Sequence, residues 1–133
     1  MDERERANDD LVMRFVKEWD APYLDGAAMA AYFTDDAVYH NVPLDPIEGG
    51  ANIVALLGGG DTPPEQRRSK NLGWVVHHQA VNGDVVINER TDSFEVEGKR
   101  WDVPVCGVFV IREGKIARWS DYFDMGHTWL PGT

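Results

Sequence analysis

Apolar residues recur every three or four positions near the start of the chain, which is the spacing of one face of a helix. These residues are Leu11, Val12, Phe15, Val16 and Trp19. The run Asn8-Asp9-Asp10 offers helix N-caps before them, and Pro22 lies just beyond them. The pattern predicts an amphipathic helix that begins at these caps and ends near Pro22.

Two shorter helices are expected further along. One covers "DGAAMAAYF", residues 25–33, and the other is centred on the apolar residues of 53–57. The glycines at 58–60 end this third helix. They do not indicate a phosphate-binding loop, because no strand precedes them in that arrangement and no Gly-Lys-Ser/Thr follows. Between the two helices "TDDAVYHNVP" predicts a strand that Pro43 and Pro46 stop.

The apolar period changes to two in the second half of the chain. Four stretches rich in β-branched and aromatic residues follow one another at 72–81, 85–96, 100–111 and 115–123, separated by "NGD", "EGK" and "EGK" turns. The preceding segment "DTPPEQRRSKN" is polar and carries prolines, so we expect a mobile loop. Helices followed by a meander of strands predict an α+β fold, with helices on one face of a sheet that curls round a pocket.

Charged residues interrupt the apolar face of two predicted strands. Alternation places Arg90, Asp92 and Phe94 on one face, opposite a polar face expected to meet water, which carries Glu89, Thr91, Ser93 and Glu95. The corresponding faces of the next two strands carry Trp101, Val103, Val105, Gly107 and Phe109, and then Trp119, Asp121 and Phe123. A charge in such surroundings must be paired or neutralised. If Asp92 and Asp121 keep one proton between them, their single negative charge would cancel the positive charge of Arg90.

Tyr39 and Asn41 are two residues apart and therefore share a face of their strand. A phenol and an amide supply donors and acceptors without charge, which suits them to orient a water molecule. Each feature alone has an ordinary explanation. "ERTD" could be a solvated strand edge, Asp121 a buried structural acceptor, and Tyr39 and Asn41 plain strand residues. Each of the three neighbouring strands has one mainly apolar face, and this common pattern favours a functional site over the separate explanations.

Composition limits the remaining possibilities. The 133 residues suit one domain spanning 1–133, and the net charge of -10 argues against nucleic acid or membrane partners. Only 67–70, with Arg67, Arg68 and Lys70, offers a basic cluster. The charged N-terminus has no signal-peptide core, and no run approaches the roughly 20 apolar residues that span a bilayer. We therefore expect a soluble cytoplasmic protein.

Metal and thiol chemistry are not expected. The single cysteine, Cys106, cannot form an intramolecular disulfide and is predicted to be a small buried filler within "VPVCGVFV". His40, His77 and His78 are interpreted as structural or surface residues, since no histidine pairs with acidic residues at ligand spacing. Asp124 points away from Asp121 on a regular strand, so it is left out of the predicted site.

Three segments together resemble the limonene-1,2-epoxide hydrolase family. They are "YHN" at 39–41, "ERTD" at 89–92 and "GVFVIREGKIARWSDYFD" at 107–124, in the order that the family has them. The resemblance implies an NTF2-like, SnoaL-like (cystatin-like) fold, with a curved mixed β-sheet and N-terminal helices closing a deep apolar pocket. It also implies a homodimer, and a one-step hydrolysis of epoxides to vicinal diols without a cofactor. Trp129 and Leu130 are candidate interface residues.

The same resemblance implies a role for each site residue. Asp121 would be the general base on water, Tyr39 and Asn41 would position that water, Asp92 would be the general acid and Arg90 would bridge the carboxyls. Four bulky residues would line the pocket and favour an apolar substrate of the terpene-like, cyclic or aryl kind. They are Phe94, Val103, Val105 and Phe123.

Two other functions fit such a fold. An isomerase or cyclase of the ketosteroid-isomerase or SnoaL kind also uses an aspartate in an apolar pocket, although it needs an oxyanion stabiliser more than an acid bridged by Arg90. A small-molecule-binding domain without catalysis is the other alternative, because a fold does not determine a function.

Overall fold

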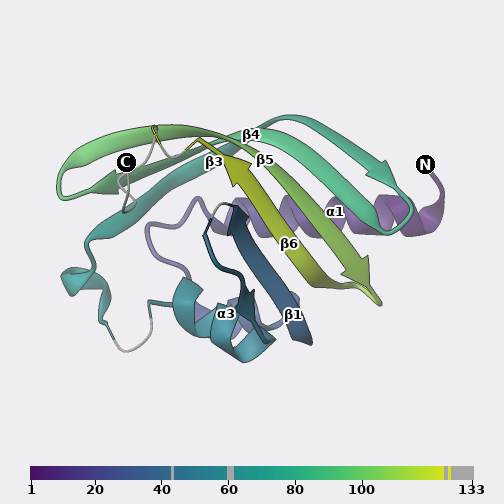
Figure 1. The fold of residues 1–133 in the computed structure, drawn as a ribbon, viewed down its shortest axis with the longest axis horizontal. Helices are drawn as coiled ribbons and strands as arrows, with labels where there is room; N and C mark the ends of the chain where they lie inside the picture. The colour runs from purple at the N-terminus through teal and green to yellow at the C-terminus, as the bar shows by residue number, and fades with distance from the viewer. Residues whose placement is uncertain (43, 60–61, 125, 127–133) are drawn as a thin grey trace.

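The computed structural model describes residues 1–42, 44–59, 62–124 and 126, which form helices beneath a curved six-stranded sheet (Figure 1). The helices are α1 (Glu3–Glu18), α2 (Gly26–Ala30), α3 (Gly50–Leu57) and a 3₁₀ turn, η1 (Pro64–Gln66). The strands are β1 (Phe33–Val42), β2 (Ile47–Glu48), β3 (Ser69–Asn82), β4 (Val85–Val96), β5 (Lys99–Arg112) and β6 (Lys115–Phe123). The expected α+β class and the four-strand meander are confirmed.

The sheet is mixed, with the strand order β2-β1-β6-β5-β4-β3. Only β1 and β6 run parallel, and the remaining neighbours pair in antiparallel fashion. The β4–β5 and β5–β6 hairpins each turn on a Glu-Gly pair, 97–98 and 113–114, in which both residues have a positive φ. Such turns match the right-handed twist of the strands that they join.

The first helix begins earlier than the predicted caps at 8–10. Asp2 is the N-cap, because its carboxylate accepts from the Glu5 backbone N–H at 2.8 Å while the Glu5 carboxylate accepts from the Asp2 N–H at 3.1 Å. This reciprocal pair satisfies two N–H groups at the start of the helix. Asn8 instead lies buried inside the helix, where it donates to the Gly83 carbonyl at 3.0 Å.

Two other predicted boundaries also differ. The second helix ends at Ala30 rather than at Phe33, because Phe33 is 3% exposed and begins β1 in the core. The first strand of the meander begins at Ser69, so part of the expected loop pairs with the end of β4. The third helix lies where the sequence predicts it, with Gly58 as its C-cap. Residues 43, 60 and 61 fall outside the described part, as do Trp129 and Leu130.

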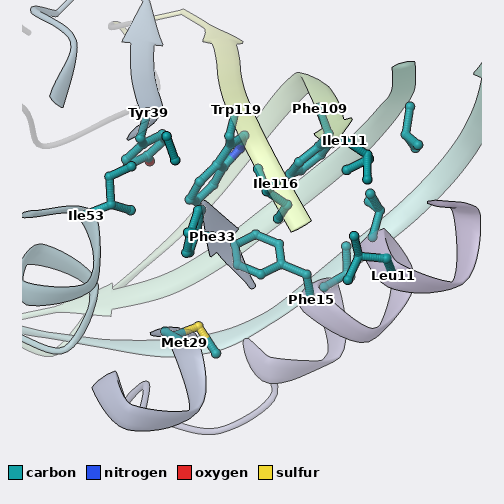
Figure 2. Packing of buried hydrophobic residues seen from close by; sticks show 14 of the residues in the cluster. Leu11, Phe15, Met29, Phe33, Tyr39, Ile53, Phe109, Ile111, Ile116 and Trp119 are labelled. Atoms are coloured by element: carbon teal, nitrogen blue, oxygen red, sulfur yellow. The ribbon is translucent and has the colours of Figure 1, made fainter. Parts of the chain in front are cut away.

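The hydrophobic core lies between the helices and the concave face of the sheet, and Met29 of α2 and Ile53 of α3 join the apolar residues of α1 in it. Phe15 projects from α1 toward the sheet (Figure 2) and is fully buried. Its ring meets those of Trp119, Phe33 and Phe109 edge-on, with centroids 5.0, 5.7 and 6.0 Å away. Aromatic pairs in this geometry gain about 0.5–1.5 kcal/mol beyond their buried area. Trp119 and Tyr39 belong to this core, and their strands also carry Asp121 and Asn41.

The convex face of the sheet carries exposed apolar residues. Val75, Ile87 and Tyr122 are 58%, 44% and 51% exposed. Cys106 is exposed as well, so its prediction as a buried filler is wrong. Alternation along β5 turns Cys106 away from Val105 and Gly107, and the described helices lie on the opposite side of the sheet (Figure 1). Among the described residues, no helix has the length and apolar character that a bilayer crossing requires.

Candidate active site

A row of polar positions crosses the middle of the concave face. Strand register places Gln79 opposite Asn88, Asn88 opposite Gly107, and Gly107 opposite Asp121, which in turn pairs with Asn41. The row therefore joins five strands at one level, although its members are up to 80 positions apart in sequence. Neighbouring rows are mainly apolar, so the polar row is enclosed.

Arg90 lies in the adjacent row, opposite Val105, and its side chain extends over Gly107 to bridge two carboxylates. Its Nε donates to Asp92 Oδ1 at 2.7 Å, and its Nη2 donates to Asp92 Oδ2 at 3.0 Å and to Asp121 Oδ2 at 2.6 Å. Arg90 is 1% exposed, and Asp92 and Asp121 are 8% and 3% exposed. Charge-assisted hydrogen bonds of this kind are about twice as strong as neutral ones. The three predicted charged residues therefore form one buried cluster.

Two neighbours hold the guanidinium from its sides. Trp74 of β3 covers one face, with the guanidinium carbon 4.0 Å from the ring centroid. Gly107 of β5 has no side chain and so leaves space for the guanidinium of Arg90. A Cβ at this position would overlap Arg90 Nη1 and lie 2.9 Å from Asp121 Oδ1. A buried cation gains from an aromatic face when water is excluded. Arg90 is thus fixed by packing as well as by ion pairs.

Trp119 and Tyr39 orient the polar side chains of Asp121 and Asn41. The indole Nε1 of Trp119 donates to Asp121 Oδ1 at 2.8 Å, and the Tyr39 ring stacks on Trp119 with centroids 3.8 Å apart. The Tyr39 hydroxyl donates to Asn41 Oδ1 at 2.8 Å. An amide whose oxygen is occupied in this way directs its Nδ2 donors elsewhere. Asp121, Asn41 and Tyr39 together offer a water molecule both acceptors and donors.

Burial and charge change the acidity of these groups. Burial raises the pKa of Asp92 to about 7; Arg90 opposes the shift and Asp121 adds to it. Burial also raises the pKa of the Tyr39 hydroxyl well above its usual value, with Asp121 contributing, so Tyr39 stays protonated. Burial alone would lower the pKa of Arg90, but Asp121 and Asp92 raise it, and the guanidinium stays charged. Asp92 can therefore hold a proton near neutral pH, whereas Arg90 cannot release one.

A cavity of about 240 Å³ opens above this cluster. Its polar wall includes Asp92, Asp121, Tyr39 and Asn41. Arg90 lies behind the two carboxyls, and its side chain has no exposed surface. The other walls come from the end of α1, the start of β3 and the inner faces of β4, β5 and β6. They include Trp19, Ser69, Asn71, Trp74, Ser93, Phe94, Val103, Val105 and Phe123.

A comparison with known families identifies the family of the chain. The limonene-1,2-epoxide hydrolase catalytic domain matches residues 7–130. The chain belongs to the limonene-1,2-epoxide hydrolase family. That assignment covers every residue of the polar row and the whole of the described cavity wall.

Individual relatives support the same family and fold. Epoxide hydrolase EphG of Mycobacterium tuberculosis is 37% identical over 93 residues, which are 68% of this chain and 57% of that protein. The matched region thus spans little more than half of that relative. The structure of an M. tuberculosis LEH-like epoxide hydrolase has a TM-score of 0.78 at 30% identity, covering 92% of this chain and 86% of that one.

More distant structures show the fold alone. An NTF2-like protein of Cytophaga hutchinsonii has a TM-score of 0.67 at 16% identity, covering 91% of this chain and 99% of that one. The expected NTF2-like fold with a curved mixed sheet is therefore confirmed.

The structure brings together all five predicted site residues, and all four predicted pocket residues line the cavity. Sequence reasoning missed Asn88, Trp74 and the roles of Gly107 and Trp119. Asn88 shares a strand face with Arg90, and Trp119 shares one with Asp121, so alternation in the sequence could have identified both. Trp74 lies on a bulged strand, where simple alternation fails.

One predicted solvent-facing residue is buried. Ser93 is 8% exposed and lines the cavity, and its hydroxyl donates to Asp102 on β5 at 2.6 Å. The histidines of β3 are exposed, and His77 Nε2 lies 2.8 Å from the Thr91 hydroxyl. Within the described ranges, no group of three or more His, Cys, Asp or Glu side chains could hold a metal ion.

Proposed function

We propose that this protein adds water to an apolar epoxide and releases a vicinal diol in one step, without a cofactor. The observation that carries the proposal is the buried Asp92–Arg90–Asp121 cluster at the wall of an apolar cavity. Opening an epoxide requires one group that takes a proton from water and another that gives a proton to the developing alkoxide. Two carboxyls in different protonation states meet both requirements.

Asp121 is the proposed general base. Trp119 and Arg90 each donate to one of its oxygens, which fixes the carboxylate while each oxygen keeps a further lone pair. A water molecule can donate to Asp121 and to the Tyr39 oxygen while it accepts from Asn41 Nδ2. Its remaining lone pair then attacks the epoxide carbon. This geometry supports the roles that the family resemblance implies for Tyr39 and Asn41.

Asp92 is the proposed general acid. Arg90 donates to both of its oxygens, and each oxygen retains a lone pair that can carry a proton toward the cavity. Its raised pKa, about 7, keeps that proton available. In one turnover Asp121 gains a proton and Asp92 loses one, so the charge of the cluster is unchanged.

The cavity suits a compact apolar epoxide, such as a terpene-like, cyclic or aryl epoxide. Phe94, Val103, Val105 and Phe123 supply apolar walls, and the carboxyls occupy one side only. This arrangement holds the hydrocarbon body and directs the oxirane ring toward Asp92 and Asp121.

A second copy of the chain is the proposed partner, with the convex face of the sheet as its contact surface.

Turnover of limonene oxide, styrene oxide and cyclohexene oxide, measured as diol release, tests the proposal. Asp92→Asn and Asp121→Asn should each remove nearly all turnover while the fold is retained, because each removes one of two proton transfers worth about 10²–10⁴ in rate. A near-parental rate in either variant would show that the assigned pair is wrong. Ligand binding without turnover of any epoxide would favour a binding domain or an isomerase.

Water labelled with heavy oxygen separates one-step hydrolysis from a covalent route. In a single turnover the label should enter the diol and leave the protein unlabelled, because water itself is the nucleophile. Label in the carboxylate of Asp121 would mean that an ester forms on the protein, and the one-step reaction would be refuted.

A further inference from the structure

A line of side-chain hydrogen bonds runs from Arg90 to the surface of α1, on the side away from the cavity. Arg90 Nη1 donates to Asn88 Oδ1 at 3.0 Å, and Asn88 Nδ2 donates to Gln79 Oε1 at 3.1 Å. Gln79 Nε2 then donates to Asp9 Oδ1 at 2.8 Å. The line therefore joins β4, β3 and α1 through two amides, and it ends on a carboxylate.

Every link in this line has the same direction. Each amide turns its oxygen toward the cation of Arg90 and its NH₂ group toward the anion of Asp9. A flipped Asn88 would place its NH₂ against Arg90 Nη1, so that two donors would face each other. Asn88 is 1% exposed, so bulk solvent cannot replace its partners, and its orientation depends on Arg90 and Gln79. Aligned buried hydrogen bonds of this kind reinforce one another.

Asn88 completes the set of partners of the guanidinium. Nε and Nη2 of Arg90 serve the two carboxyls, whereas Nη1 meets Asn88. With Nη1 held, the plane of the guanidinium is fixed against rotation, and Nη2 must bridge Asp92 and Asp121. Without Asn88, Nη1 would be a buried donor lacking this acceptor, and the guanidinium would turn to find another. Such a turn would move both carboxyls from their places.

We propose that Asn88 is a positioning residue for the reaction, and that Gln79 and Asp9 hold it in the required orientation. This inference rests on the proposed hydrolysis for its kinetic consequence, but not for its geometric one. Asn88 does not line the cavity and contacts no substrate. It acts through Arg90, whose orientation sets the distance between the acid and the base.

Kinetics of Asn88→Leu and Gln79→Leu test the positioning role, since leucine keeps much of the volume and removes the hydrogen bonds. We expect kcat for the best epoxide to fall roughly 10- to 100-fold in Asn88→Leu and by less in Gln79→Leu, with KM nearly unchanged, because small misplacements of reacting groups cost about this much. A folded Asn88→Leu protein with the parental kcat would overturn the proposal.

Asp9→Ala and Asp10→Ala form a matched pair on α1. Both remove one acid from neighbouring helix positions, but only Asp9 accepts from Gln79. Asp9→Ala should lower kcat by a few-fold, roughly as Gln79→Leu does, whereas Asp10→Ala should leave it unchanged. These surface changes keep the test available should Asn88→Leu fail to fold. Equal rates in the two alanine variants, with no effect of Gln79→Leu, would overturn the role of the line.

A spectroscopic measurement tests the geometry without any substrate. In isotope-labelled protein the Nη groups of Arg90, assigned by their loss in Arg90→Lys, should give separate resonances because rotation about Nε–Cζ is blocked. In Asn88→Leu these resonances should broaden or merge, and their persistence would refute the proposal. Should the parent hydrolyse no epoxide, the proposed function would fail while this measurement still decided the positioning of Arg90.

Discussion

Gly107 lies opposite both Asn88 and Asp121 in the sheet, and the guanidinium of Arg90 occupies the space above it. A side chain here would compete with Arg90 for that space. Its neighbours on the same face of β5, Val105 and Phe109, are large and apolar. The glycine is therefore explained by the arginine on the adjacent strand and not by any backbone requirement of β5.

Gly107→Ala should damage the site more than the fold. The added Cβ would overlap Arg90 Nη1 and press on Asp121 Oδ1, so Arg90 must move away from the carboxyls. We expect turnover to fall at least 10-fold and stability to fall by about 1–3 kcal/mol, as for other overpacked sites. Diol release and urea unfolding measure the two effects. Lys17→Ala, at an exposed position of α1, is the control and should leave turnover and stability nearly unchanged.

The acidity of Asp92 predicts how the rate depends on pH. As the proposed general acid, Asp92 acts only while protonated, and burial raises its pKa to about 7. We therefore expect kcat/KM to decline as the pH rises through about 7. The pH profile with a neutral epoxide measures this directly. A rate that stays constant from about pH 6 to 9 would contradict the assignment of Asp92 as the acid.

The same shift predicts how stability depends on pH. The folded-state pKa of Asp92, about 7, lies above its ordinary value of 3.8, so the unfolded chain loses this proton first as the pH rises. The stabilisation that protonated Asp92 gives to the folded state is complete below about pH 4 and is lost progressively up to about pH 7. Asp92→Asn cannot ionise, so its urea midpoint should fall less than that of the parent across this window. Parallel curves for the two proteins would contradict the shift.

At the scale of elements, α1 connects the core to the site. Phe15 packs on Trp119, and Trp119 in turn donates to Asp121. One turn later, Trp19 stacks on Trp74 with centroids 4.1 Å apart, and Trp74 covers Arg90. Because both aromatic contacts end at the charged cluster, the helix supports this cluster as well as the hydrophobic core.

Phe15→Ala should therefore reduce both stability and turnover. The ring is fully buried, and removing a buried phenylalanine side chain costs about 3–5 kcal/mol. Urea unfolding measures the loss, and the rate at low denaturant shows whether Trp119 and Asp121 have shifted. Lys17→Ala, at an exposed position of the same helix, should change stability by no more than about 0.5 kcal/mol. Similar values for the two variants would contradict the role of α1.

Elements were predictable where a local pattern governs them. The meander strands and the third helix follow from alternation, apolar spacing and glycine, and the structure shows them within a few residues of the predicted bounds. The predicted start of α1 at Asn8–Asp10 was wrong, because the Asp2–Glu5 capping box provides a better start. Buried Asn8 and hydrogen-bonded Asp9 serve contacts with distant strands, which no local pattern reveals.

At the scale of the whole molecule, the convex face of the sheet is the candidate contact surface of a dimer. Val75, Ile87 and Tyr122 are at least 44% exposed there, and Cys106 lies among them on β5. Exposed apolar residues gathered on one face favour association. The net charge of -10 on each copy opposes association, so a dimer should be tighter in salt, which screens the repulsion.

Ile87→Glu should shift the protein from dimer to monomer, because it places a charge in the apolar contact. Sedimentation at several concentrations and two salt levels measures the equilibrium. Leu56→Glu makes the same exchange at a 52% exposed position on α3, away from the convex face, and should leave the equilibrium unchanged. A monomeric parent, or a dimer that Ile87→Glu leaves intact, would refute this contact surface.

The sequence by itself determined which side chains share a face. Arg90 and Asp92 point the same way because alternation is a property of each strand, and the same rule groups Trp119 with Asp121. Only the tertiary structure decided that these faces meet at one level. Register between strands depends on hydrogen bonds and packing among segments far apart in sequence. That register sets Asn88, Gly107 and Asp121 side by side, and it turns an isolated arginine and two aspartates into one cluster.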